Sequence, residues 1–327
     1  MLGKLSELSV LFFVLVIVVL LMWGLNGGSF MHLGNFQSMA FQLPELGILS
    51  LAMMIAMLTS GINLSIIASA NLSGIVMAMI LTGAVTGDAQ GASVLGVVGA
   101  AILAGLAVSA LIGLINGLLI AYLGISPILA TLGTMIMGQG LALVFTKGSV
   151  LSGLPAPFLW IGNGLLLGVP VPFLVFIACS LIMSVILGRT PLGTRIYLMG
   201  SNPTACFYSG VNNRAVLMRT YLISGLYAGM AAVIMIARFN SAKADYGESY
   251  LLLTVLASVL GGVSAAGGFG RVSGLILSLI ILQFVSSGLN LFGANSFLTL
   301  SLWGVILVFV MVVKYLIERY RQGRLAT

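Results

Sequence analysis

Long stretches of apolar residues without any charge are the feature that most constrains this chain. The run from Leu8 to Met22 contains no charged residue, and comparable runs follow along the sequence. A run of about 18 or more apolar residues is long enough to cross the hydrocarbon core of a bilayer as a helix. Backbone groups in lipid must bond within the protein, so only helices or closed barrels can span it. The runs lack the alternating polar positions of barrel strands, and we therefore predict helices.

The composition excludes a water-soluble globule. Hydrophobic residues make up 60% of the chain and charged residues only 6%, whereas soluble domains carry about 25% charged residues. No small-x-small cleavage site follows the first run, which we interpret as a span rather than a signal peptide. Cys179 and Cys206 have neither the placement of a disulfide nor a metal-ligand spacing. The net charge of +7 comes from basic residues that flank apolar runs, which indicates membrane topology rather than nucleic-acid binding.

The fold class that follows is an all-α integral membrane protein, a single transmembrane domain over residues 1–327 with about ten helices. The ten predicted spans lie near residues 8–26, 40–59, 63–84, 93–122, 127–146, 164–187, 216–237, 250–266, 272–292 and 296–316. Short pieces near 59–63 and 261–271 are predicted to be broken or re-entrant rather than simple turns.

Ten spans place both termini on one side of the membrane, and the basic residues indicate which side. The loops on the side of the termini collect ten Lys or Arg residues and those on the other side collect three, which sums to the thirteen in the chain. Because cytoplasmic loops are enriched in Lys and Arg, both termini are predicted to be cytoplasmic. The three on the external side are Lys147, Arg238 and Lys243.

Several functional elements are missing from the sequence. No predicted loop is long enough to form a domain, which takes about 50 residues. No phosphate-binding loop of the pattern G-x-x-x-x-G-K-[ST] occurs, so any ATP that drives the protein would bind to a separate subunit. The single histidine, His32, lies in a predicted external loop, and no set of residues suggests a catalytic or metal site. We therefore expect a protein that is not an enzyme and binds no cofactor itself.

The longest polar stretch, residues 188–215, is predicted to contain a short helix on the cytoplasmic side. Asn202 can cap its start, Pro203 suits the first helical position, and Gly210 can end it in a left-handed conformation. Phe207 and Tyr208 lie between these ends. The helix would either fill a groove of a partner protein or lie on the membrane surface with its aromatic rings buried, and the residues alone do not separate the two.

This stretch resembles the cytoplasmic signature of bacterial ABC permeases of the ribose, galactose, xylose and autoinducer-2 class, roughly Gly-x-Asn-x-x-Ala-Ala-x-x-Ser-Gly-Ile. The chain matches at Gly200, Asn202, Ala205, Ser209 and Gly210, and has Cys206 and Val211 where the signature has alanine and isoleucine. Residues 117–134 and 250–274 are also similar to the family.

The resemblance implies an importer of a sugar or sugar-like solute in the bacterial cytoplasmic (inner) membrane. In such a system the loop would be the coupling helix that docks on an ABC ATPase subunit, which would bind ATP and magnesium. The residues that the resemblance and the loop composition assign to this contact are Gly200, Asn202, Pro203, Ala205, Phe207, Tyr208, Ser209, Gly210 and Arg214. A periplasmic or lipoprotein solute-binding protein and a second permease, identical or related, would complete the assembly in the lipid membrane, with no nucleic acid.

A second motif departs from that family. Residues Ser60 to Ser65 read Ser-Gly-Ile-Asn-Leu-Ser, where the family usually has Gly-Gly-Ile-Asp-Leu-Ser. Asn63 keeps an acceptor and adds donors but loses the charge of the aspartate. One hypothesis is that this chain pairs with a different permease that retains the acid.

Polar residues inside the predicted spans are the candidates for a solute path, because polar side chains at bilayer depth usually face the bundle interior or water. The alternative is that they hold helices together, as small-residue pairs such as Gly113–Gly117 and Gly225–Gly229 do. The candidates are Asn63, Asn71, Asn116, Gln139, Gln283, Ser286, Ser287 and Asn290. The predicted path residues are Asn63, Ser65, Gln139 and Asn290, neutral groups that suit a polyol better than an ion.

The main rival function is an ion-coupled secondary transporter or a channel for a small neutral solute. Proton-coupled carriers usually hold acidic residues or histidine inside their spans. Glu45 and the other acidic residues are predicted at or near span ends, which argues against proton coupling. The predicted external loop at 238–249, with Arg238, Lys243, Asp245 and Glu248, is a candidate surface for the solute-binding protein.

Overall fold

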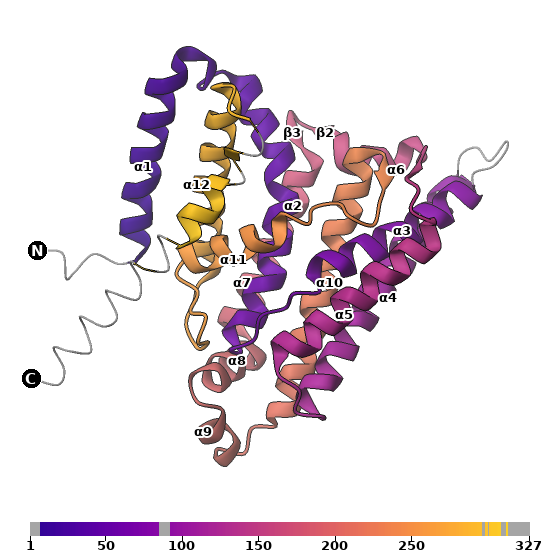
Figure 1. The fold of residues 1–327 in the computed structure, drawn as a ribbon, viewed down its shortest axis with the longest axis vertical. Helices are drawn as coiled ribbons and strands as arrows, with labels where there is room; N and C mark the ends of the chain where they lie inside the picture. The colour runs from indigo at the N-terminus through magenta and orange to yellow at the C-terminus, as the bar shows by residue number, and fades with distance from the viewer. Residues whose placement is uncertain (1–6, 85–91, 296–297, 300, 309–311, 313–327) are drawn as a thin grey trace, which may run out of the picture.

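The computed structural model is almost entirely helical and describes residues 7–84, 92–295, 298–299, 301–308 and 312 (Figure 1). Its long helices are α1 (Glu7–Asn26), α2 (Leu33–Leu58), α3 (Ile66–Ala84), α4 (Ala92–Ala121), α5 (Pro127–Thr146), α7 (Val171–Arg189), α10 (Asn213–Phe239) and α12 (Val272–Leu291). Its shorter helices are η2 (Gly27–Ser29), α6 (Ala156–Asn163), α8 (Pro191–Ser201), α9 (Pro203–Tyr208) and α11 (Tyr250–Leu260).

Two small antiparallel pairs of strands lie at the end of the molecule opposite α9. Strand β1 (Leu151–Ser152) pairs with β4 (Ser241–Ala242), so that Leu151 faces Ala242. Strand β2 (Leu165–Leu166) forms a hairpin with β3 (Val169–Pro170). This hairpin occupies the start of the span predicted at 164–187, and α7 begins only at Val171.

Within the described residues, the eight long helices are each apolar and long enough to cross a membrane, and each coincides with a predicted span. The span predicted at 250–266 is not one continuous helix: α11 has 11 residues, about 17 Å of helix, which is too short by itself for a bilayer core of about 30 Å, and the chain continues past Leu260 without helix. The span predicted at 296–316 lies largely outside the described residues. The predicted breaks are confirmed, because α2 ends at Leu58 and the chain is not helical between α11 and α12.

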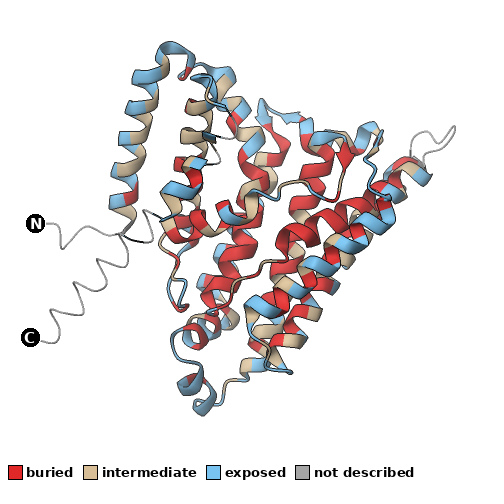
Figure 2. Cartoon of the chain, in the orientation of Figure 1, coloured by how far each residue is buried: buried red, intermediate tan, exposed pale blue. Residues whose placement is uncertain are grey.

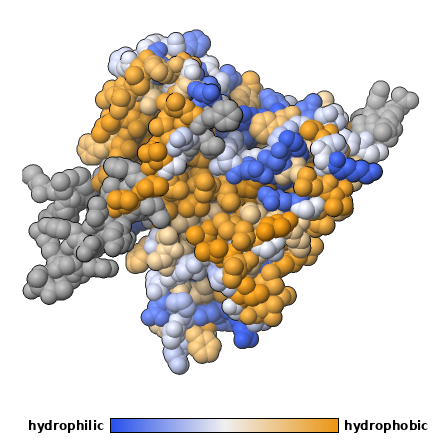
Figure 3. Space-filling model, in the orientation of Figure 1, coloured by the Kyte–Doolittle hydropathy of each residue, from blue (hydrophilic) through white to orange (hydrophobic). Residues whose placement is uncertain are grey.

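The core lies where α2 and α10 cross the middle of the molecule. Figure 2 shows α2, α3 and α10 largely buried and α1, α4 and α5 with exposed outer faces. The exposed faces are apolar: Ile17 on α1 and Leu181 on α7 are 57% and 62% exposed. Orange, hydrophobic atoms cover much of the view in Figure 3, with blue atoms at its top and bottom and in a band on its right-hand side. An apolar surface of this extent is expected of a protein surrounded by lipid.

Glycines allow α4 and α10 to approach each other closely. A Cβ atom on Gly113 would lie 3.2 Å from the Cα of Gly225 and against the carbonyl oxygen of Tyr221. A Cβ on Gly225 would in turn meet the carbonyl oxygen of Ser109. The prediction that Gly113–Gly117 and Gly225–Gly229 hold helices together is therefore confirmed, since small residues let helix backbones pack without lipid between them.

We expect Gly113→Ala to lower the stability of the protein, because the added methyl group meets backbone that cannot move aside. The expected loss is about 1–3 kcal/mol, measured as a lower unfolding midpoint in detergent. Gly99→Ala is the matched control on the same helix, since a Cβ there meets nothing within 4 Å. It should leave the midpoint unchanged or raise it slightly. Equal midpoints for the two variants would contradict the close contact.

Candidate functional site

Helix α9 is a short, well-capped helix at one end of the molecule, in the lower part of Figure 1. The Asn202 side chain accepts a hydrogen bond of 2.9 Å from the backbone N–H of Ala205, and Pro203 occupies the first helical position. Gly210 follows with φ of +78°, a left-handed conformation that glycine adopts without strain. The predicted start and end of this helix are confirmed.

The outer surface of α9 presents two aromatic rings to its surroundings. Phe207 and Tyr208 are 65% and 83% exposed, and their rings meet edge to face with centroids 5.9 Å apart. Cys206, between them and Ala205, is buried and anchors the helix to the core. Exposed large aromatic rings on so short a helix favour contact with another surface over contact with water.

The segments that flank α9 fix its orientation. The Ser209 hydroxyl donates to the carbonyl of Ala205 at 2.9 Å, and the Asn213 amide donates to the carbonyl of Pro203 at 2.8 Å. The guanidinium of Arg214 lies 5.6 Å from the centre of the Tyr122 ring, in the loop between α4 and α5. The described residues of the loop predicted at 188–215 thus consist of α8, α9 and the first turn of α10, in contact with one another.

The chain reversals after α2 and after α11 meet at the C-terminal end of α8. The backbone N–H of Gly268 donates to the carbonyl of Leu58 at 3.0 Å. The hydroxyl of Ser60 donates to the carbonyls of Ala266, at 2.6 Å, and of Gly200, at 3.2 Å. A Cβ on Gly200 would overlap the carbonyl oxygen of Leu58, so only glycine fits at position 200, one of the positions that match the permease signature. We call this contact of residues 58–60, 200–201 and 266–268 the helix-break junction.

Two further features stabilise the helix-break junction. The hydroxyl of Tyr197, on α8, donates to the carbonyl of Gly270 at 2.9 Å. Burial raises the pKa of Tyr197 above its usual value, so the hydroxyl keeps its proton at physiological pH. Ser60 itself has φ of +61°, which is uncommon for a residue with a side chain. Its two hydrogen bonds offset that strain. The sequence did not identify Ser60 or Tyr197 as contacts of the loop.

Asn63 and Ser65 lie in a buried hydrogen-bond network between the α2–α3 break and three helices. The Asn63 amide donates to Ser224 of α10 at 2.9 Å, and its oxygen accepts from the backbone N–H and hydroxyl of Ser65. Asn116 of α4 donates to the Ser65 hydroxyl at 2.8 Å and accepts from Thr134 of α5. The network satisfies these buried polar groups inside the protein and holds the four segments together.

The other two predicted path residues lie apart from this network. Gln139 is partly buried on α5, and Asn290 is exposed on α12. Figure 1 places α5 and α12 on opposite sides of the molecule, separated by α2 and α10. The structure therefore brings Asn63 and Ser65 together and leaves Gln139 and Asn290 on separate surfaces. Among the described residues, no three His, Cys, Asp or Glu side chains gather as a metal site.

Comparison with known proteins places these features in a family. Residues 35–313 match the family model described as branched-chain amino acid transport system / permease component. The chain belongs to this permease family. It is 35% identical to the ribose import permease of Bacillus subtilis strain 168, over 92% of this chain and 89% of the relative.

Other relatives are named for different solutes. The D-allose transport system permease of Escherichia coli K12 is 28% identical over 94% of this chain and 91% of its own. The autoinducer 2 import system permease of Yersinia pseudotuberculosis YPIII is 28% identical over 91% of this chain and 88% of its own. No solved structure matches. The relatives are named as permease proteins of import or transport systems, so the chain is a multi-pass transport subunit of the bacterial inner membrane rather than an enzyme.

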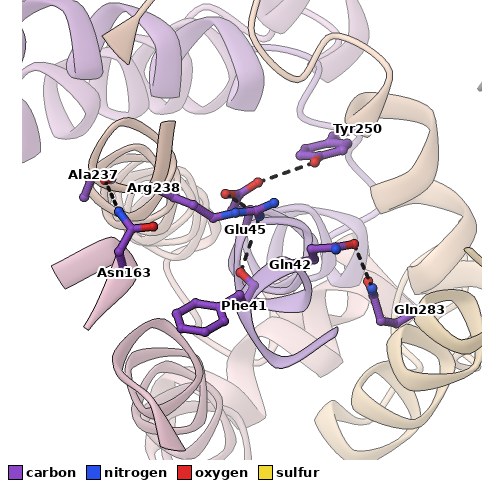
Figure 4. A network of polar contacts seen from close by, with 8 residues as sticks. All are labelled: Phe41, Gln42, Glu45, Asn163, Ala237, Arg238, Tyr250 and Gln283. Carbon is purple, nitrogen blue, oxygen red and sulfur yellow. Dashed lines mark hydrogen bonds and ion pairs between the residues drawn. The ribbon is translucent and has the colours of Figure 1, made fainter. Parts of the chain in front are cut away.

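The permease also contains a buried ion pair whose two residues were predicted to lie at a span end and in an external loop. Glu45 lies in the middle of α2, fully buried, and not at a span end. Arg238 lies in the last turn of α10 rather than in an external loop, and its Nη1 is 2.8 Å from Glu45 Oε1. Figure 4 shows the hydroxyl of Tyr250, at the start of α11, directed at the other carboxylate oxygen, 3.4 Å away.

The position of Glu45 inside α2 bears on whether the protein could be a proton-coupled carrier. An acidic residue does lie inside a span, so the predicted lack of acidic residues in the spans no longer argues against proton coupling. Its charge is instead paired with Arg238, which also donates to the carbonyl of Phe41 at 3.4 Å. The helix α2 begins at Leu33, seven residues before the predicted span, and this earlier start puts Glu45 at mid-helix.

We expect Arg238→Gln to destabilise the permease strongly, because it leaves the Glu45 carboxylate buried without its charged partner. Removing one member of a buried pair costs about 3 kcal/mol or more. The double variant Glu45→Gln, Arg238→Gln should recover part of this loss in a detergent unfolding assay.

The exposed pair Lys243–Asp245 supplies the control, with its Nζ–Oδ2 distance also 2.8 Å. Lys243→Gln should leave the unfolding midpoint unchanged, because solvent screens an exposed pair. A double variant at Glu45 and Arg238 that unfolds even earlier than Arg238→Gln would contradict the pairing.

Proposed function

We propose that this chain is the membrane-spanning subunit of an ATP-driven importer for a sugar or sugar-like solute. ATP and magnesium bind on a separate ATPase subunit that docks on α9, and an external binding protein delivers the solute at the opposite end. A second permease, identical or related, completes the pore, and both termini face the cytoplasm. The relatives, which are named for ribose, D-allose and autoinducer 2, support this solute class.

The observation that carries the proposal is the connection of α9 to the helix-break junction. A docking helix transmits a movement only if it is attached to parts of the membrane domain that can take two positions. The end of α8 contacts the backbone of the α2–α3 break and of the α11–α12 break through Gly200 and Ser60. Asn202 both ends α8 and caps α9, so a push on the exposed rings of α9 is passed directly to the end of α8 that contacts both breaks.

The coupling contact is proposed for the nine residues from Gly200 to Arg214 named above, within the loop at 188–215. Asn202, Pro203, Ala205, Ser209 and Gly210 shape the helix, and Phe207 and Tyr208 make the contact. The solute path at Asn63, Ser65, Gln139 and Asn290 stays a prediction. An ion-coupled carrier remains the rival function, and transport that continues without an ATPase would establish it.

We expect Phe207→Ala and Tyr208→Ala to release the ATPase subunit, because exposed aromatic side chains provide much of the affinity at protein interfaces. A central aromatic contact contributes about 2 kcal/mol or more, roughly 30-fold in affinity. The measurement is co-purification of the full chain with its ATPase in detergent.

Phe145→Ala is the control, an equally large side chain on α5 that is 47% exposed. It should retain the ATPase. Retention of the ATPase by a Phe207→Ala, Tyr208→Ala double variant would overturn the assignment of α9 as the docking helix.

We expect Ser60→Ala to uncouple ATP hydrolysis from transport, because it removes the hydroxyl that joins the α2 break to Gly200 and Ala266. In proteoliposomes that contain the full complex, ATP hydrolysis should continue while solute transported per ATP falls roughly fivefold or more. Ser50→Ala removes a hydroxyl bonded only to Leu46 within α2 and should preserve the ratio. An unchanged ratio in Ser60→Ala would show that the junction does not transmit the movement.

A further inference from the structure

Helix α12 carries a row of polar side chains along one face. The row consists of Gln283 and of Ser286, Ser287 and Asn290, which follow it by three, four and seven residues. This spacing places all four on one side of an α-helix. Asn290 is exposed, and the other three are partly buried. A single polar face on a helix this apolar indicates surroundings different from those of its other faces.

A matching polar row runs along α2 opposite α12. Asn35, Ser38 and Gln42 follow the same spacing, and the two rows touch at two levels. The hydroxyl of Ser287 donates to the Asn35 side chain at 2.7 Å. The Gln283 amide donates to Gln42 at 3.2 Å, as Figure 4 shows. We call the two rows together the polar seam.

The polar seam is exposed at a depth where lipid would make it costly. Gln42 is exposed, yet it lies nine residues inside α2, about 14 Å from the start of the helix. Gln283 lies eight residues from the end of α12, about 12 Å inside. Polar side chains at such depth face water or protein rather than hydrocarbon. By contrast, the exposed residues at matching depth on α1 and α7 are Ile17 and Leu181.

The polar seam is open at one end and closed at the other. At the end away from α9 it reaches a surface hollow of about 620 Å³, lined by Gly28, Ser29, His32, Gly34, Asn35, Ser38 and Leu291. At its inner end, one turn deeper than Gln42, the Glu45–Arg238 pair and Tyr250 join α2, α10 and α11. The rings of Phe36 and Phe284 meet edge to face beside the seam, 6.1 Å between centroids.

We propose that the polar seam between α2 and α12 is the entry path for the solute, with a binding subsite at Gln42 and Gln283 and a floor at the Glu45–Arg238 pair. Two amide side chains offer donors and acceptors to hydroxyl groups, and the neighbouring rings offer an apolar surface to the carbon skeleton. The absence of net charge along the seam suits a neutral polyol and disfavours an ion. The inference rests on the proposed function; the seam shares Asn290 with the predicted path and lies apart from Asn63, Ser65 and Gln139.

Water access tests this path without any transport measurement. Ser38→Cys, Gln42→Cys and Ser287→Cys are each placed in the full chain, whose native Cys179 and Cys206 are buried. A membrane-impermeant maleimide is added from the side opposite α9. The seam cysteines should react at least tenfold faster than Ile17→Cys and Leu181→Cys, the controls at matching depth in the apolar surface. Seam cysteines as slow as these controls, in the assembled complex, would overturn the proposal.

Transport then tests the subsite. With D-ribose as the probe and the complete complex in proteoliposomes, Gln42→Leu and Gln283→Leu should each raise the KM for the solute–binding-protein complex or lower uptake at least fivefold. Ile17→Ala should leave uptake unchanged. Wild-type complex that takes up D-ribose while both Gln variants do so normally would refute the subsite alone. Wild-type complex that hydrolyses no ATP and takes up D-ribose on an ion gradient would refute the importer function instead.

Discussion

Backbone hydrogen bonds at interrupted helices are the requirement on which the rest of this structure depends. Inside a membrane, each helix end leaves N–H and C=O groups that water cannot satisfy. Here the two interruptions satisfy each other, because Gly268 donates to the carbonyl of Leu58 and Ser60 donates to that of Ala266. Thr131 completes the α2–α3 break by donating to the carbonyl of Ile62 and accepting from the N–H of Leu64. These bonds join α5 and the segment between α11 and α12 to the break between α2 and α3.

Sequence reasoning recovered what depends on local chemistry. Apolar run length located the eight long helices, and side-chain capping located α9 between Asn202 and Gly210. It failed where the outcome depends on contacts between distant segments. The strand pair at 165–170 is as apolar as the helix that follows it, so hydropathy merged the two. Residues 250–266 are also mostly apolar, but the glycines after Leu260 end α11 against α12.

In the candidate site, too, local features could be predicted from the sequence and contacts between distant segments could not. The residues of α9 were predictable because each has a local role in a short helix. The helix-break junction was not, since nothing in the sequence relates Ser60 to Gly200 or Tyr197 to Gly270. The predicted positions of Glu45 and Arg238 were wrong. Each lies within a few residues of a predicted span end, but Glu45 belongs to α2 and Arg238 to α10. An acid and a base near the ends of two spans are worth testing as a pair.

The bond between Gly268 and the carbonyl of Leu58 also bears on how the chain is made. The two residues are 210 positions apart in the sequence. At a synthesis rate of about 5–20 residues per second, the ribosome reaches residue 268 roughly 10–40 s after residue 58. During that interval the carbonyl of Leu58 and the hydroxyl of Ser60 lack the hydrogen-bond partners that the segment between α11 and α12 later provides. Water or the insertion machinery must shield them, so the first half of the membrane domain waits unfinished for the second.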